Sequence, residues 1–120
     1  MPPIDYEYIT YKNVDEVAVV NFNESVSMFD SDKVQLVGRE LLDLVASRRY
    51  TKILLNLSNA HFVSSAMLAH LVKLNRKIQE SKGKLRLCCL RPVIVDAFRV
   101  SSFDKIFDIY ADEASALKKF

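Results

Sequence analysis

Two adjacent serines, Ser64 and Ser65, are the residues of this 120-residue chain best placed for covalent chemistry. They follow an apolar run of strand length, 53–57, and a short polar link, and they precede an amphipathic stretch with helical spacing. A hydroxyl at the start of a helix lies beside free backbone N–H groups and the positive end of the helix dipole, which favour a phosphate. The pair therefore indicates a phosphoryl acceptor. Its alternative role is that of a helix cap, the most frequent task of serine before a helix.

The other reactive side chains do not combine into a site at any spacing that we can assign to catalysis or metal binding. His61 falls in the link before the serines and His70 in the helix after them, and no Gly-x-Ser-x-Gly motif is present. Cys88 and Cys89 are neighbours in an apolar run and lack the Cys-x-x-Cys spacing of zinc and redox sites. The two glycines are too few for a phosphate-binding loop. We therefore predict a protein that is not an enzyme and that holds no metal and no cofactor.

Composition and charge limit the partners of the chain. Half of the residues are hydrophobic, and the net charge of +2 is too small to indicate a nucleic acid or a membrane surface. Residues 1–5 have no features of a signal peptide, and no apolar stretch reaches transmembrane length. Adjacent cysteines are most simply reduced thiols. These features predict one cytoplasmic domain over residues 1–120, without a nucleic-acid partner or membrane insertion. A local group of basic residues fits a solvated helix face or an acidic partner: Lys73, Arg76, Lys77, Lys82 and Lys84.

The hydrophobic periodicity predicts five strands and four helices. The chain begins with a hairpin of strands 6–12 and 16–22 around a link at 13–15, and a helix from a cap at 30–32 to Arg48-Arg49 follows. Next come a strand at 52–57, a helix from the serines to Gly83, and a strand at 85–90. The last elements are a helix at 93–100 that begins at Pro92, a strand at 107–110, and a helix from a cap at Asp112 to Leu117. Gly83 is expected to end its helix in the left-handed conformation.

The alternation of strands and helices predicts parallel pairing with right-handed crossovers, and the hairpin adds an antiparallel edge. The fold class is therefore a single α/β domain with a mixed, mostly parallel sheet of about five strands and about four helices. The expected core side chains of the first two helices recur every three or four residues: Val34, Val37, Leu41, Leu44 and Val45, then Met67, Leu71, Leu74 and Ile78.

Residues 53–68 resemble the central segment of the STAS domain, the fold of bacterial anti-sigma factor antagonists. In that family, a buried strand ends in an Asn- or Asp-Leu-Ser-like step, and the segment Asp-Ser-Ser-Gly-Leu follows. Here the corresponding residues are Val63-Ser64-Ser65-Ala66-Met67. Leu90-Arg91-Pro92 and residues 103–114 are similar to the C-terminal half of the family, so the resemblance covers roughly residues 6–118.

The resemblance implies a regulatory binding protein. Its Ser64, or alternatively Ser65, would be phosphorylated by an anti-sigma factor that is also a serine kinase, and a metal-dependent serine phosphatase would reverse the reaction. Ser65 would help to cap the helix. ATP and metal would belong to these partners. The implied partner-binding surface consists of Asn23, Val26, Met28, Phe29, Val63, Ser65, Ala66 and Met67.

Two residues depart from the family pattern. Val63 replaces the acidic residue before the serines, and Ala66 replaces the glycine after them. These changes imply an altered partner specificity, a slower phosphorylation or a member that is not phosphorylated. The alternative function is therefore a non-phosphorylated STAS protein, either a scaffold that binds other STAS proteins in a stress-sensing assembly or an accessory subunit of a lipid transporter.

Overall fold

A five-stranded sheet with helices on both faces forms the framework of the protein. The computed structural model describes residues 6–23, 31–118 and 120. The strands lie in the order β1 (Ile9–Val14), β2 (Val17–Phe22), β3 (Lys52–Asn56), β4 (Lys84–Cys88) and β5 (Asp108–Tyr110). The first pair is antiparallel and the others are parallel, as the alternation of elements predicts. The α/β fold class with its mixed sheet is thus confirmed.

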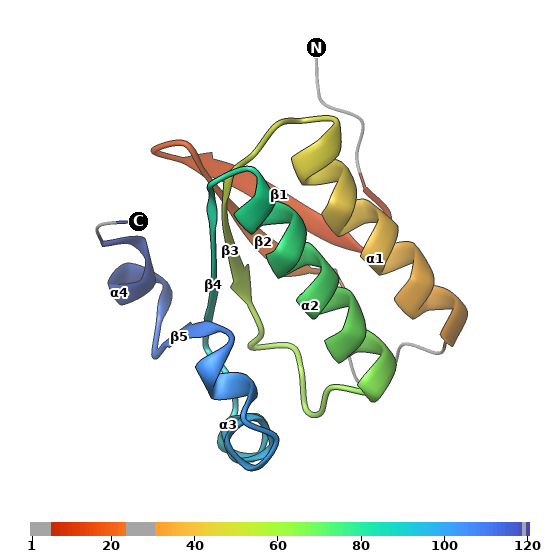
Figure 1. Cartoon of the computed structure of the whole chain (residues 1–120), viewed down its shortest axis with the longest axis vertical. Helices are drawn as coiled ribbons and strands as arrows, with labels where there is room; N and C mark the ends of the chain where they lie inside the picture. Colours follow the sequence, from red (N-terminus) through yellow and green to blue (C-terminus); the bar gives the residue numbers. More distant parts are fainter. Residues whose placement is uncertain (1–5, 24–30, 119) are drawn as a thin grey trace.

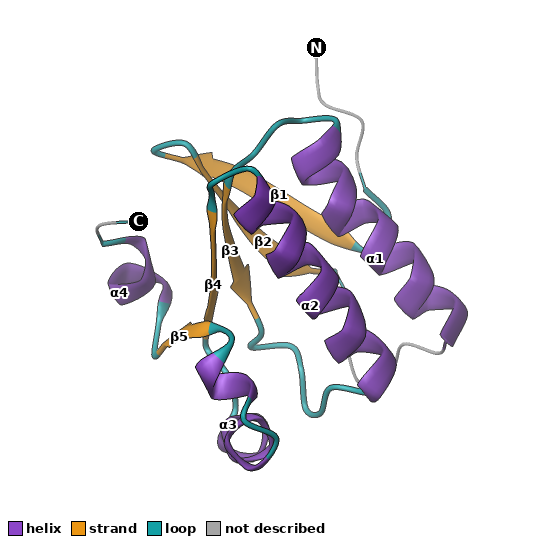
Figure 2. Ribbon diagram, in the orientation of Figure 1, coloured by secondary structure: helices purple, strands orange, loops and turns teal. Residues whose placement is uncertain are grey.

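Helices lie on both faces of the sheet (Figures 1 and 2), and the core contacts assign three of the described helices to one face and one to the other. Because neighbouring parallel strands follow each other in the chain, right-handed crossovers place their helices on a common face. These are α1 (Ser31–Ala46), α2 (Ser65–Glu80) and α3 (Pro92–Val100), whereas the short α4 (Glu113–Leu117) packs on the opposite face. A 3₁₀ helix, Phe103–Lys105, which the periodicity did not predict, precedes β5.

The alternation of side chains along the central strand divides the core into two layers. Ile53 and Leu55 of β3 face the three helices, and Leu54 between them faces α4; all three are completely buried. The periodic side chains predicted for α1 and α2 all lie in the larger layer and confirm the predicted core faces of both helices. The sheet therefore holds α2 rigidly, which matters because Ser64 precedes this helix directly.

The hairpin turn lies later than the sequence indicated. Asp15 and Glu16 have φ angles of 49° and 73°, the left-handed values that a two-residue hairpin turn requires. The prediction of a link at 13–15 and a strand from residue 6 was therefore wrong. β1 begins at Ile9 because the backbone N–H groups of Glu7 and Tyr8 donate to the Glu40 carboxylate, at 2.7 and 2.9 Å, and so do not enter the sheet.

A polar cluster ties the segment before β1 to the end of α1. The Tyr6 and Ser47 hydroxyls each donate to the Asp43 carboxylate at 2.6 Å, and these hydrogen bonds lower the pKa of Asp43. Burial, followed by the hydrogen bond to Asp43, raises the pKa of Tyr6 to about 12. Arg48 donates to the Tyr6 hydroxyl at 2.8 Å and lies over its ring. α1 ends at Ala46, so Arg48 binds this cluster instead of closing the helix as predicted.

The end of α2 corrects the predicted role of Gly83. The left-handed residue is Lys82, with a φ of 59°, and Gly83 does not have a positive φ. The N–H of Gly83 donates to the carbonyl of Ile78 at 2.9 Å, which completes a Schellman-type end. Glycine is required for space, because a Cβ here would lie 1.9 Å from the carbonyl oxygen of Thr51.

A buried arginine joins α4 to the sheet. Arg86 in the middle of β4 is only 6% exposed, and its Nη1 donates to the carbonyls of Ala116 and Lys118, both at 2.8 Å. Its guanidinium carbon lies 4.8 Å from the ring centroid of Tyr110 and 4.6 Å from that of Phe120. The charge is thus used to satisfy the C-terminal end of α4. At its other end, α4 has the predicted cap, since Asp112 accepts the N–H of Ser115 at 2.7 Å.

β4 ends earlier than predicted. The strand stops at Cys88 instead of Leu90, because Cys89 has a φ of 62° and leaves the extended conformation. Cys88 is buried as expected, Cys89 is half-buried, and both thiols are free. Burial raises the pKa of the Cys88 thiol well above its usual range, so this sulfur is a packing group and a poor nucleophile.

Candidate functional site

Ser64 is the residue that caps α2. Its backbone is extended, with φ −72° and ψ 162°, and its Oγ accepts the backbone N–H of Met67 at 3.1 Å. Ser65 is the first helical residue and is exposed, so the expectation that Ser65 helps to cap the helix was wrong. The side chain of the residue preceding a helix is the one that reaches the N–H of the third helical residue. Ser64 is half-buried and is therefore accessible in part.

The start of α2 is favourable for an added negative charge. The first backbone N–H groups of a helix have no partner within the helix, and the helix dipole adds about half a positive charge there. The first turn of α2 contains no acidic residue, and Ser65 and Ala66 are both exposed. A phosphate on the Ser64 oxygen would therefore lie beside available donors. The assignment of Ser64 as the phosphorylation site remains a prediction.

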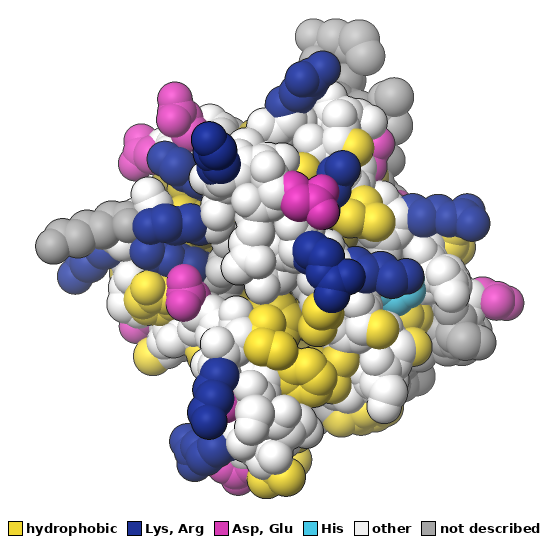
Figure 3. Space-filling view, viewed as in Figure 1, with side chains coloured by type: hydrophobic (Ala, Val, Ile, Leu, Met, Phe, Trp, Pro, Cys, Tyr) yellow, Lys and Arg dark blue, Asp and Glu magenta, His cyan; other side chains and the backbone are white. Residues whose placement is uncertain are grey.

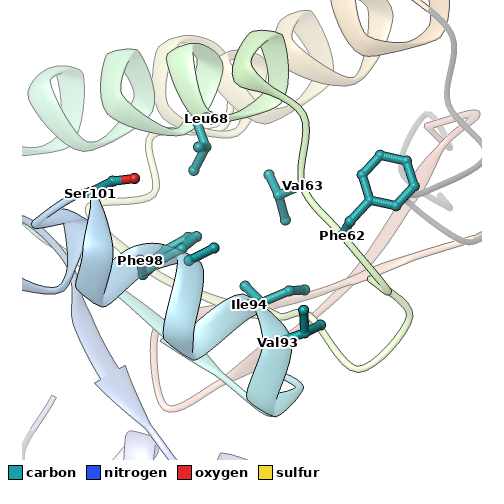
Figure 4. A pocket seen from close by; sticks show the side chains of 8 residues that line it. Phe62, Val63, Leu68, Val93, Ile94, Phe98 and Ser101 are labelled. Atoms are coloured by element: carbon teal, nitrogen blue, oxygen red, sulfur yellow. The ribbon is translucent and has the colours of Figure 1, made fainter.

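An apolar groove lies directly beside Ser64, between α2 and α3. Its deepest part is a cavity of about 120 Å³ with side chains from the link before α2, from α2 itself and from α3 (Figure 4). The lining residues are Phe62, Val63, Leu68, Val93, Ile94, Ala97, Phe98 and Ser101. A second hollow of about 270 Å³ continues along α2, where Ser65, Ala69 and Val72 form one wall and Phe103 lies opposite. We call these two hollows together the α2–α3 groove.

The rim of the groove leaves large apolar surfaces in water. Phe62 is 55% exposed and Val93 is 61% exposed, and Val100 on the same helix is 87% exposed. Figure 3 shows that apolar side chains gather between α2 and α3, with basic side chains beside them. Contiguous exposed apolar surface of this kind commonly marks an interaction site. The groove therefore has the features of a protein-binding surface.

The structure places the predicted partner-binding residues in three different environments. Val63 and the exposed Ser65 line the groove, whereas Ala66 is exposed on the first turn of α2 but does not line it. Met67 is 2% exposed and belongs to the core, so it offers no surface to a partner. Asn23 is exposed, and its side chain donates to the carbonyl of Glu7 at 3.0 Å. The remaining three predicted residues, Val26, Met28 and Phe29, lie outside the described residues.

The sequence reasoning missed Phe62, Leu68 and Val93 as residues of this surface. A signal was present, because Phe62 is a large apolar residue in the otherwise polar link before the serines. In α3, Ile94 faces the core, and Val93, one residue earlier, belongs to a second apolar stripe of the helix. A helix that is apolar on more than its core face can have a partner.

The other reactive side chains remain dispersed. His61 is exposed, whereas His70 lies against Gly38 in the contact between α1 and α2. Burial, followed by the charge of Lys73, lowers the pKa of His70, which keeps the ring neutral near pH 7. Among the described residues, no group of three or more His, Cys, Asp and Glu side chains could hold a metal ion. Within the same residues, no helix has the length and apolar character needed to cross a membrane.

Comparison with known proteins identifies the family. The model of the STAS domain matches residues 8–116. The Thermotoga maritima protein TM1081 superposes with a TM-score of 0.83 at 23% identity over 92% of each chain. An anti-sigma-factor antagonist (STAS) domain protein from Planctomyces limnophilus gives 0.79 at 22% identity, over 91% of this chain and 94% of that one. The anti-sigma factor antagonist SpoIIAA in its unphosphorylated form gives a TM-score of 0.68 at 14% identity, over 90% of this chain and 92% of that one. The phosphorylated form of SpoIIAA from Bacillus gives a TM-score of 0.66 at 17% identity, over 90% of this chain and 96% of that one. No curated protein sequence matches significantly. The fold is that of anti-sigma factor antagonists, and the chain belongs to the STAS domain family.

Proposed function

We propose that this protein is a regulatory binding protein of the anti-sigma factor antagonist type, active in the cytoplasm and switched by phosphorylation of Ser64. The observation that carries the proposal is the position of Ser64. Its half-buried hydroxyl caps α2, and its two chain neighbours, Val63 and Ser65, line the apolar groove. An anti-sigma factor that is also a serine kinase would be the partner, and it would dock on the groove with the serine in reach of its ATP.

Phosphorylation would act on docking while leaving the fold intact. The Oγ of Ser64 attacks the γ-phosphorus of ATP, the bond to the ADP oxygen breaks, and the hydroxyl proton passes to a base of the kinase. The product carries about −1.5 to −2 charges and three acceptor oxygens. The helix start can receive this charge. At an interface, however, an unmatched charge costs about 2–5 kcal/mol, so the modified protein would be released until a metal-dependent serine phosphatase restored the hydroxyl.

Val63 adapts the site to an apolar partner surface. Its side chain lines the same cavity as Phe62 and Leu68, so the replacement of the family's acidic residue adds a methyl-bearing contact to the groove. Ala66 is exposed at the first turn of α2, where its Cβ limits how closely a partner backbone can approach. We therefore propose a partner whose contact with residues 63–66 is apolar and slightly further from the backbone.

The test combines modification and binding. Intact-mass and peptide mass spectrometry on protein isolated from its native cells should find a phosphate on Ser64, and the S64A variant should lack it whereas S65A keeps it. In affinity capture from the same cells, wild-type protein should retain a serine kinase and S64D should not. The matched control is S81D, because Ser81 is exposed at the far end of α2 and lies outside the groove. Equal capture by wild type and S64D, with no phosphate under any growth condition, would contradict the proposal.

The second candidate function is a non-phosphorylated scaffold or accessory subunit, and one observation favours it. α3 exposes Val93 and Val100 one above the other, seven residues apart, and this stripe continues the apolar surface away from Ser64. A stable assembly with other STAS proteins or with a transporter subunit could bury the whole stripe. Capture of such partners by wild type, S64A and S64D alike would support this candidate over the switch.

A further inference from the structure

The wall that α2 contributes to the α2–α3 groove is basic at one end. Ala69 and Val72 line the groove. Lys73 follows Ala69 by four residues and Arg76 follows Val72 by four, so each lies one turn further along the same side of the helix. Both are exposed, and in the part of the chain that the structure describes neither forms an ion pair with a carboxylate. The apolar wall therefore continues into two positive charges at the end away from Ser64.

The opposite wall of the groove does not balance these charges. α2 has three basic side chains in its second half, and its one acidic residue is Glu80 at the last position. In α3, Asp96 and Arg99 lie 3.8 Å apart as an ion pair, and in the following 3₁₀ helix Asp104 is succeeded by Lys105, so this wall is neutral. Figure 3 shows basic side chains beside the apolar surface between α2 and α3. The groove thus combines apolar surface with a net positive charge on its α2 wall.

The length of the groove fits one amphipathic helix. Its two hollows, of about 120 and 270 Å³, share Leu68 and Ser101 as lining residues and are therefore continuous. From Ser65 to Arg76 the α2 wall spans about 16 Å, which is about three helical turns. A helix of about twelve residues can place apolar side chains at positions i, i+4 and i+7 in such a groove. Its flank then lies beside Lys73 and Arg76.

The described helices of a second copy of this chain do not fit the groove. α2 is basic, α3 is neutral, and α4 has only five residues. The apolar stripe of α1 is buried in the core. Its Glu40 carboxylate accepts two backbone N–H groups, and its Asp43 carboxylate accepts two hydroxyls. The occupant is therefore a segment of a different protein.

We propose that the α2–α3 groove binds an acidic amphipathic helix of the partner protein. The inference rests on the proposed function, in which the partner docks on this groove, and it specifies the segment that makes the contact. The apolar side chains of the helix fill the hollows against Leu68 and Phe103, and its Asp or Glu side chains pair with Lys73 and Arg76. A phosphate on Ser64 then faces an acidic segment, so charge repulsion adds to the cost of docking.

The first experiment identifies the segment that lies in the groove. The photo-crosslinking amino acid p-benzoylphenylalanine replaces Ala69, which is exposed and lines the groove, in protein produced in its native cells. In the matched control it replaces Lys77, which is exposed on the same helix and lies outside the groove. Mass spectrometry should find a crosslink from position 69 alone, to a segment with net negative charge and apolar residues three or four positions apart. A crosslink to another copy of this chain or to a neutral or basic segment overturns the proposal, and so does the absence of a crosslink specific to position 69.

Charge variants then test the pairing, with a synthetic peptide of the crosslinked segment as the probe. In fluorescence anisotropy at low salt, K73E/R76E should raise the dissociation constant at least about tenfold, because two attractions become two repulsions. K77E reverses a charge on another side of α2 and should raise it less than about threefold. All three positions are exposed, so the variants should remain folded. Equal dissociation constants for K73E/R76E and K77E overturn the proposal.

The outcomes separate this inference from the proposed switch. A phosphate on Ser64 together with a crosslinked segment that is not acidic retains the switch and overturns the acidic helix. An acidic helix that binds S64D as tightly as wild type retains the helix and contradicts the switch.

Discussion

Replacement of Ser64 by alanine should destabilise the domain by about 1 kcal/mol, because it removes the side-chain oxygen that caps α2. This oxygen accepts the N–H of Met67 at 3.1 Å in a partly buried position. For a domain of this size, about 1 kcal/mol corresponds to a fall of about 3–6 °C in Tm. Alanine at Ser65 should change the stability by less than about 0.5 kcal/mol, because Ser65 is exposed and makes no capping bond.

Aspartate at Ser64 should leave the domain as stable as wild type or stabilise it by up to about 1 kcal/mol. A carboxylate can accept the same N–H and adds a negative charge to a first turn that has no acidic residue. The expected order of stability is therefore S64D at or above wild type, then S65A, and S64A below them. If S64D also loses its partner, the loss cannot be attributed to unfolding.

The assay is urea unfolding of the four proteins, followed by far-UV circular dichroism, at low and at high salt. The stability gained by S64D should shrink at high salt, because salt screens exposed charges. The deficit of S64A should persist, because it comes from a neutral hydrogen bond. Equal unfolding midpoints for S64A and S65A would refute the capping argument. A strong destabilisation of S64D would refute the argument that the start of α2 accepts an anion.

Three further predictions concern the framework that holds this site. G83A should destabilise the domain by about 2–3 kcal/mol in urea unfolding, because its Cβ would lie 1.9 Å from the backbone oxygen of Thr51, which cannot move cheaply. R86L should lower the free energy of unfolding by about 2–3 kcal/mol and speed hydrogen exchange of the backbone amides of residues 113–117, because two carbonyls at the end of α4 lose their donor. Unchanged exchange would show that α4 docks without Arg86. The pKa of Asp43 is lowered by the hydroxyls of Ser47 and Tyr6, so its contribution to stability is present above about pH 4 and lost as the pH falls through the folded-state pKa. Unfolding of D43N, measured from neutral to acidic pH, should therefore show a shallower loss of stability than wild type.

Signals carried by single residues were sufficient to predict the order of the elements. Pro92 begins α3, Asp112 caps α4, and the aliphatic residues 53–55 form the buried central strand. Each signal acts over one turn or one strand, so it can be interpreted without knowing the neighbours. The family match over residues 8–116 agrees with this order.

Features that depend on distant parts of the chain were not predicted. Gly83 is explained by the backbone of Thr51, thirty-two positions earlier, and not by its own φ angle. Arg86 interrupts an apolar strand, a signal visible in the sequence, but its role requires the carbonyls of α4. The α2–α3 groove likewise needs the spacing between two helices, which no periodicity contains. Sequence reasoning therefore located Ser64 but not the surface around it.

The magnitudes at this surface explain how one phosphate could control binding without a change of fold. Phe62 and Val93 are about half exposed, so a partner that covers both would gain about 1–1.5 kcal/mol from each, half of the value for full burial. The resulting 2–3 kcal/mol is of the same size as the 2–5 kcal/mol cost of an unmatched charge at an interface. A phosphate on Ser64 could therefore cancel the apolar contribution of the groove rim and weaken docking by about thirty- to several-thousand-fold. Because α2 is fixed by its core stripe and its start can accept the charge, the loss would fall on the complex and not on the free protein.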